Sequence, residues 1–76
     1  MTKQEQLVEY QIQDIIEYIV TDIQIEYDKA MQIFYNSQTF DKLTEIETGL
    51  YLESPAYVYG LFQDERNFGH LIQAEI

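Results

Sequence analysis

The apolar residues between Val8 and Ile23 most constrain what this chain can fold into. They are separated by one, three or four positions, which is the spacing of a single stripe on an α-helix and breaks the alternation of a β-strand. The stripe consists of Val8, Ile12, Ile15, Ile16, Ile19, Val20 and Ile23. Polar residues, among them Asp14 and Glu17, fall on the opposite side. A lone helix cannot cover such a stripe, so we expect the rest of the chain to pack on it.

The ends of this first helix are marked unequally. Thr2 and Glu5 have the pattern of a capping box, so the helix is predicted to begin there and to continue to about Asp22. No glycine or proline occurs before Gly49, and a single helix of more than about 30 residues is therefore also allowed. Stiff β-branched side chains and the need to cover the stripe favour a break at residues 24–26 instead.

Three shorter helices are predicted after the break, over about residues 26–36, 38–46 and 55–67. The side chains expected to face inward from them are Tyr27, Ala30, Met31, Phe34, Phe40, Leu43, Ala56, Val58, Leu61 and Phe62. The result is an all-α fold, a compact array of about four helices that are mostly antiparallel because their connections are short.

Turn residues separate these predicted helices. Ser54 and Pro55 form the sharpest boundary, a serine N-cap followed by proline at the first helical position. Gly49 is predicted to make a turn with positive φ, and residues 50–53 an extended link. Gly69 is the expected end of the last helix. We treat residues 1–76 as one domain in which residues 70–76 form a loosely held tail.

Residues that catalysis and metal binding require are scarce. The chain has no cysteine, a single histidine at position 70 and three widely separated glycines. These counts argue against a histidine-based triad, a zinc site and a phosphate-binding glycine loop. We therefore expect no enzyme, no cofactor, and no catalytic or metal-binding residue.

The charge of the chain points to its partners. Fourteen acidic and four basic residues give a formal net charge of −10. The scattered basic residues argue against direct nucleic-acid binding, and the charge opposes anionic membranes and favours a basic protein partner. Three pairs of like charges lie one helical turn apart, a spacing that lowers stability: Glu5 with Glu9, Asp22 with Glu26, and Asp41 with Glu45. No membrane span or secretory signal is recognisable, so a cytoplasmic location is expected.

Acids and tyrosines are the candidate partner surface. Asp14 and Glu17 share the polar face of the first helix, and Tyr51, Tyr57 and Tyr59 gather in one later segment. Tyrosine is enriched at interfaces because its ring can be buried while its hydroxyl bonds at the rim. The alternatives are that the acids form a solvated face and that the rings complete a small core. We take these five residues as the candidates for partner binding.

The second half of the chain resembles a family of small bacterial proteins of unknown function. The resemblance lies in a Y-x-S-x-T-F/Y pattern from Tyr35, a T-G-L-Y-x-x-S pattern from Thr48, and a Y-x-Y pattern from Tyr57. More distantly, it is similar to helical domains often encoded beside toxin-like genes. The resemblance implies a helical, antitoxin-like interaction protein and brings no catalytic motif. Gln24 stands where we would expect a glycine in such relatives.

These observations predict a non-enzymatic bacterial interaction module that binds a basic protein. A homodimer through spare apolar surface is compatible with this prediction. The alternative is an acidic nucleic-acid mimic, in which carboxylates imitate phosphate spacing and occupy a basic groove on a DNA-binding partner. Neutralising Asp14, Glu17 and Asp22 would weaken binding by such a mimic.

Overall fold

The computed structural model describes residues 2–69, which form four α-helices and two short 3-10 helices. These are α1 (Lys3–Ile23), α2 (Tyr27–Tyr35), α3 (Gln38–Thr44), η1 (Ile46–Thr48), η2 (Leu50–Leu52) and α4 (Pro55–Phe68). No strand occurs in this range, which confirms the predicted all-α array. The expected tail at residues 70–76 lies outside the described residues. No helix of the described part is long and apolar enough to cross a membrane.

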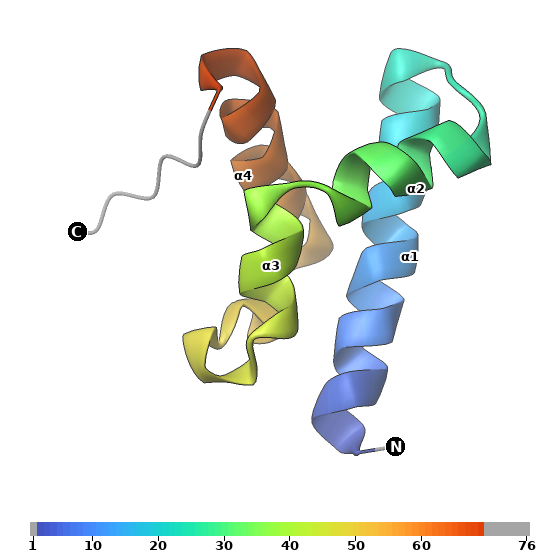
Figure 1. Cartoon of the computed structure of the whole chain (residues 1–76). Helices are drawn as coiled ribbons and strands as arrows, with labels where there is room; N and C mark the ends of the chain where they lie inside the picture. Colours follow the sequence, from blue (N-terminus) through green and yellow to red (C-terminus); the bar gives the residue numbers. More distant parts are fainter. Residues whose placement is uncertain (1, 70–76) are drawn as a thin grey trace.

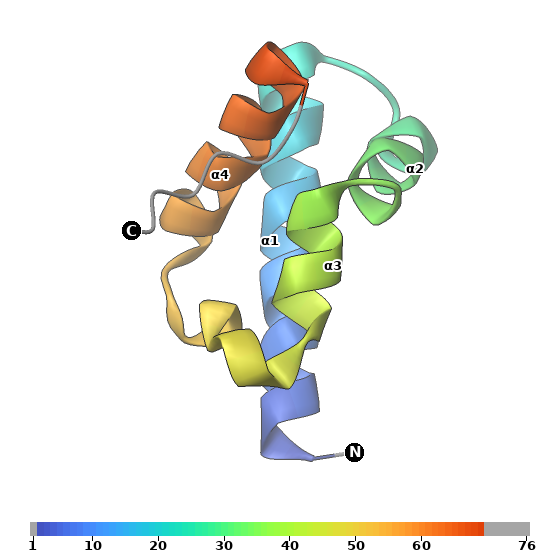
Figure 2. The same cartoon turned by 60° about the vertical axis from the view of Figure 1, so that its left-hand side comes forward.

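The later elements are arranged along α1, the longest helix (Figures 1 and 2). After α1, the short helix α2 crosses its upper half, and α3 then runs down in the opposite direction to α1. η1 and η2 turn the chain at the lower end of α3, beside the lower half of α1, and α4 then returns upward in the same general direction as α1. Only part of the array is therefore antiparallel.

α1 begins at its predicted cap and buries most of its predicted stripe. The Thr2 hydroxyl accepts a hydrogen bond from the Glu5 N–H at 3.1 Å, and the Glu5 carboxylate accepts one from the Thr2 N–H at 2.9 Å. The buried apolar residues of the helix are Val8, Ile12, Ile15, Ile16 and Ile19. Val20 is half-buried and packs against this core, whereas Ile23, at the last position of α1, is 39% exposed.

The chain breaks after α1 at the predicted position. Gln24 adopts a left-handed conformation with φ of 60°, and residues 24–26 lead into α2. A left-handed residue with a side chain costs about 1 to 2 kcal/mol. The turn brings α2 back so that Ala30 and Phe34 are fully buried. A continuous helix would leave those side chains without this core.

The positive φ of Gln24 should lower the stability of the fold, and replacing this residue with glycine tests that. We expect Gln24→Gly to raise the free energy of unfolding by about 0.5 to 1 kcal/mol. Glycine adopts positive φ without strain, and this gain is larger than the stability lost because glycine has more freedom in the unfolded chain. Gln13→Gly, in the exposed middle of α1, is the matched control and should lower it by about 1 kcal/mol. Urea unfolding followed by circular dichroism measures both. A loss of stability in Gln24→Gly would contradict the prediction, because it would mean that the relief of strain is smaller than the cost of the added freedom of glycine in the unfolded chain.

Most side chains predicted to face inward do so. Ala30, Phe34, Leu43, Val58, Leu61 and Phe62 are buried, and Met31 and Phe40 are half-buried. The prediction was wrong for Tyr27 and Ala56, which are exposed. Both lie in the first turn of their helices, where they reach past the edge of the core. Ser54, Pro55 and Gly69 occupy their predicted capping positions around α4.

Residues 50–53 do not form the extended link that we predicted. Gly49 turns the chain with φ of 69°, and Leu50–Leu52 then form η2 with Leu50 buried. The Gln11 side chain, itself buried, donates from Nε2 to the carbonyl of Tyr51 at 3.3 Å and to the carbonyl of Glu53. These bonds from α1 supply the partner that the isolated segment lacks. The sequence did hold one signal of this contact, because Gln11 lies between Val8 and Ile15 on the apolar stripe, where a polar side chain needs a buried partner.

Candidate partner-binding groove

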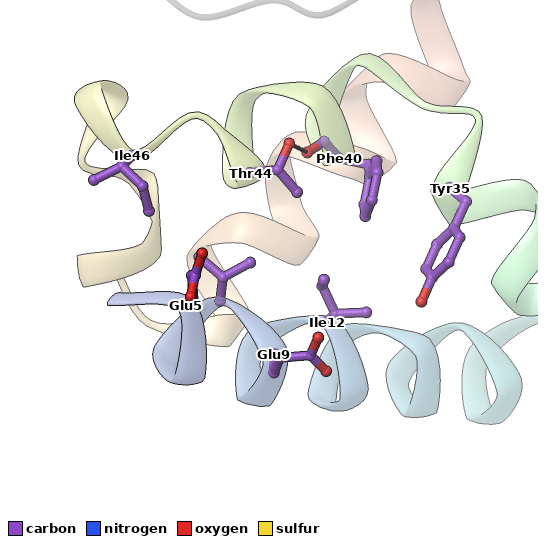
Figure 3. A pocket seen from close by; sticks show the side chains of 8 residues that line it. Glu5, Glu9, Ile12, Tyr35, Phe40, Thr44 and Ile46 are labelled. Carbon is purple, nitrogen blue, oxygen red and sulfur yellow. Dashed lines mark hydrogen bonds between the residues drawn. The ribbon is translucent and has the colours of Figure 1, made fainter. Parts of the chain in front are cut away.

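A groove lies between the N-terminal half of α1 and the wall formed by α3 and η1 (Figure 3). Its volume is about 490 Å³, within the range of binding sites for small ligands and side chains. Its lining residues are Glu5, Val8, Glu9 and Ile12 from α1, Tyr35 from α2, Phe40 and Thr44 from α3, and Ile46 from η1. The chain thus brings four elements together around one mostly apolar depression.

Helical spacing places two acids beside the apolar floor. Val8 and Ile12 are 7% and 8% exposed and form the floor. Glu5 and Glu9 lie on the same side of α1, one turn apart, and are exposed. One edge of the groove therefore carries two carboxylates directly above an apolar surface.

The opposite wall is aromatic and aliphatic. Phe40 stacks on Tyr35 with 4.7 Å between ring centroids, and it forms a T-shaped pair with Phe34 at 5.6 Å. Tyr35 and Ile46 are 45% and 39% exposed. The Thr44 hydroxyl donates to carbonyls of its own helix at 3.1 Å, so its methyl group faces the groove. Figure 3 shows Tyr35, Phe40 and Ile46 pointing toward α1.

Glu65 of α4 fixes the start of α3. Its carboxylate accepts hydrogen bonds from the Gln38 N–H at 2.8 Å, the Thr39 N–H at 2.9 Å and the Thr39 hydroxyl at 2.8 Å. The Ser37 hydroxyl accepts from the Phe40 N–H at 3.0 Å, as expected for an N-cap. Because α3 has only seven residues, these bonds set the position of the groove wall that carries Phe40.

The five candidates from the sequence lie outside this groove. Asp14 and Glu17 are exposed and line a separate depression on α1, together with Tyr18, Thr21 and Asp22. Tyr51 is half-buried, Tyr57 is 48% exposed and Tyr59 is 8% exposed. Since Tyr57 and Tyr59 are two positions apart on a helix, they point to different sides. The structure brings the two acids together and separates these two tyrosines.

Sequence analysis did not identify the groove residues as a site. The pair Glu5 and Glu9 was visible as like charges one turn apart, but two other pairs shared that pattern. What distinguishes this pair is its position facing Phe40 and Ile46 across an apolar floor. That position depends on how α3 and η1 pack, so the charge pattern alone could not select it.

Tyr59 joins α4 to the end of α1. Its hydroxyl donates to the Asp22 carboxylate at 2.8 Å, and its ring stacks on Tyr18 with 5.2 Å between centroids. Burial, together with the hydrogen bond to Asp22 and the charge of that residue, raises the pKa of Tyr59 from 10.0 to about 12. In this position the Tyr59 side chain holds two helices together.

The raised pKa predicts how stability changes at alkaline pH. The folded protein holds the Tyr59 proton more tightly than the unfolded chain, so this stabilisation is fully present below pH 10 and is lost as the pH rises through about 12. We expect Tyr59→Phe to be about 1 kcal/mol less stable at pH 8 and to lose less stability than the wild type above pH 10. Urea midpoints across this range measure the effect, with exposed Tyr10→Phe as the control. Identical pH profiles for Tyr59→Phe and the wild type would contradict the prediction.

The chain matches no protein-family model, and no curated protein or solved structure is significantly similar to it. Within residues 2–69, no group of three or more histidine, aspartate or glutamate side chains is placed to hold a metal ion.

Proposed function

We propose that the protein is a non-enzymatic cytoplasmic module that binds a basic segment of a partner protein in the groove between α1 and α3. The observation that carries this proposal is the pairing of an apolar floor with two exposed carboxylates, Glu5 and Glu9, on one edge. Such a surface offers hydrophobic burial to apolar side chains and charge pairing to lysine or arginine beside them.

Two further features support a basic partner. The net charge of −10 attracts positively charged proteins from a distance and raises the rate of encounter. Tyr35 and Ile46 remain substantially exposed at the groove although both are large and apolar, so a partner that covers them gains their burial. In the antitoxin-like form of the proposal, the bound segment belongs to a toxin-like protein.

Matched charge variants test the proposal. Glu5→Gln/Glu9→Gln neutralises the groove edge, and Asp14→Asn/Glu17→Gln neutralises the separate acidic depression; each removes two negative charges. Glutamine at position 5 can still complete the capping box with Thr2, so α1 keeps its N-cap. The immobilised wild type is used to capture partners at low salt, and the captured protein is then purified and its affinity measured.

We expect the groove variant to bind the purified partner about three- to thirtyfold more weakly, the effect of two charge pairs worth about 0.3 to 1 kcal/mol each. The Asp14→Asn/Glu17→Gln variant should bind as the wild type does, and wild-type affinity should fall at high salt. Equal weakening of both variants would mean that only overall charge matters. Failure to capture any partner at low or high salt would overturn the proposal.

The nucleic-acid mimic remains the second candidate because Asp14, Glu17 and Asp22 line one depression on α1. It predicts the reverse result, in which Asp14→Asn/Glu17→Gln loses the partner and the groove variant retains it. It also predicts that duplex DNA competes with the wild-type protein for the partner.

A further inference from the structure

We infer that the partner segment in the groove is an α-helix that carries two basic residues one turn apart, facing Glu5 and Glu9. This inference rests on the proposed function and adds the conformation and spacing of the bound segment. Three observations carry it: the polar groups of the lining, the spacing of the carboxylates, and the distribution of basic residues in this chain.

The groove offers few partners to the backbone of an extended peptide. The Thr44 hydroxyl donates to its own helix, and the Glu5 carboxylate already accepts from Thr2. The other polar side chains of the lining are Glu9 and Tyr35. No strand edge occurs in residues 2–69, so a bound peptide cannot extend a sheet there. A helix satisfies most of its backbone hydrogen bonds internally and can enter an apolar groove without leaving them unpaired.

The spacing of the carboxylates matches that of a helix. Glu5 and Glu9 are four residues apart on α1, which places them about one turn, or roughly 6 Å, apart along its axis. A helix lying along α1 presents residues i and i+4 at the same interval. Apolar residues at i+3 and i+7 then lie beside the basic pair and can face the floor at Val8 and Ile12.

The groove limits the contact to a short segment. Phe40 and Thr44 are also four residues apart, and Tyr35 and Ile46 lie at opposite ends of the depression in Figure 3. The lining residues of α1 run from Glu5 to Ile12, about two turns, so about two turns of a helix lying along α1 contact the lining.

A second copy of this chain does not supply such a helix. Its four basic residues are Lys3, Lys29, Lys42 and Arg66, and no two of them lie within one helical turn. The bound helix must therefore come from a different protein.

Three designed peptides of about 18 residues and identical composition apart from one proline test the inference. The first carries lysines at i and i+4 and leucines at i+3 and i+7. The second has one lysine moved by two positions, and the third has a proline in the central turn. Fluorescence anisotropy with the full chain measures their affinities. We expect the first peptide to bind at least tenfold more tightly than either of the others.

A charge exchange checks the contact at Glu9. Glu9→Lys should bind the first peptide more weakly, and a peptide with glutamate in place of the facing lysine should recover affinity for this variant. Recovery at neither of the two lysine positions would overturn the proposed pairing. Glu9 is the better position for exchange because Glu5 also caps α1.

The outcomes separate this inference from the proposed function. Equal binding of the proline peptide would show that the segment need not be helical, while the proposed groove would stand. Equal binding of all peptides to Glu5→Gln/Glu9→Gln and to the wild type would show that the two carboxylates do not contact them. That result would overturn this inference, whereas the proposed function is decided by the purified partner. If the captured partner binds in the groove but no peptide binds, the helical inference is wrong and the proposed function is retained.

Discussion

Replacing Phe34 with alanine is expected to lower the free energy of unfolding by about 3 to 5 kcal/mol. Phe34 is fully buried, and its ring meets the edges or faces of Phe40 and Phe62 with 5.6 and 5.5 Å between centroids. Truncation removes these contacts and leaves a cavity where α2, α3 and α4 meet. Because small domains are stable by only about 5 to 15 kcal/mol, the variant should be largely unfolded or close to it.

Urea unfolding followed by far-ultraviolet circular dichroism measures this loss. Phe68→Ala removes the same side chain from an exposed position near the end of α4, where 60% of the residue is accessible, and should change stability by less than about 0.5 kcal/mol. The loss of stability in Phe34→Leu should lie between those of Phe34→Ala and Phe68→Ala. Equal effects of the two alanine variants would mean that Phe34 is not at the centre of the core.

Replacing Glu65 with alanine is expected to lower the free energy of unfolding by about 2 to 3 kcal/mol. The carboxylate accepts three hydrogen bonds at the start of α3, and one donor is the hydroxyl of Thr39, a fully buried residue. Without Glu65, that hydroxyl and the first N–H groups of α3 lose their partner. The wall of the groove that carries Phe40 should loosen as a result.

Glu17→Ala, on the exposed face of α1, is the control for Glu65→Ala and should have an effect within about 0.5 kcal/mol. Hydrogen exchange gives a second readout, since the amides of α3 should exchange faster in Glu65→Ala while those in the middle of α1 do not. A double-mutant cycle with Thr39→Val isolates the contact between the two side chains. Unchanged exchange in α3 would contradict the role of Glu65 as its anchor.

The elements that the sequence predicted well are those with local signals. α1 follows from an apolar period and a capping box within its first turn, and the start of α4 follows from Ser54 and Pro55. The break at Gln24 was predicted from β-branched neighbours and from the need to cover the stripe, although no glycine marks it. Each of these signals acts over a few residues, so it can be recognised without knowing the rest of the fold.

The error at residues 50–53 and the missed side-chain contacts have distant causes. Residues 50–53 were expected to be extended because no partner for them was visible, yet Gln11 bonds to the carbonyl of Tyr51 across 40 positions. Glu65 caps α3 across 26 positions, and Tyr59 bonds to Asp22 across 37. The place of Gln11 on the apolar stripe signals that its side chain is buried, but no local pattern identifies the partners in these three contacts, since each depends on how whole helices pack.

The sequence by itself determined the helices, the apolar stripe and the acidic surplus, because helix formation and amphipathicity depend on neighbours within one or two turns. The tertiary structure alone decided which acids border an apolar groove, which tyrosine is buried, and which polar side chains anchor α3 and η2. These features arise from burial and hydrogen bonds between residues far apart in the chain. In the sequence, Glu5 and Glu9 are one of three similar charge pairs. In the structure they differ from the other two because the packing of α3 and η1 beside α1 places an apolar surface next to them.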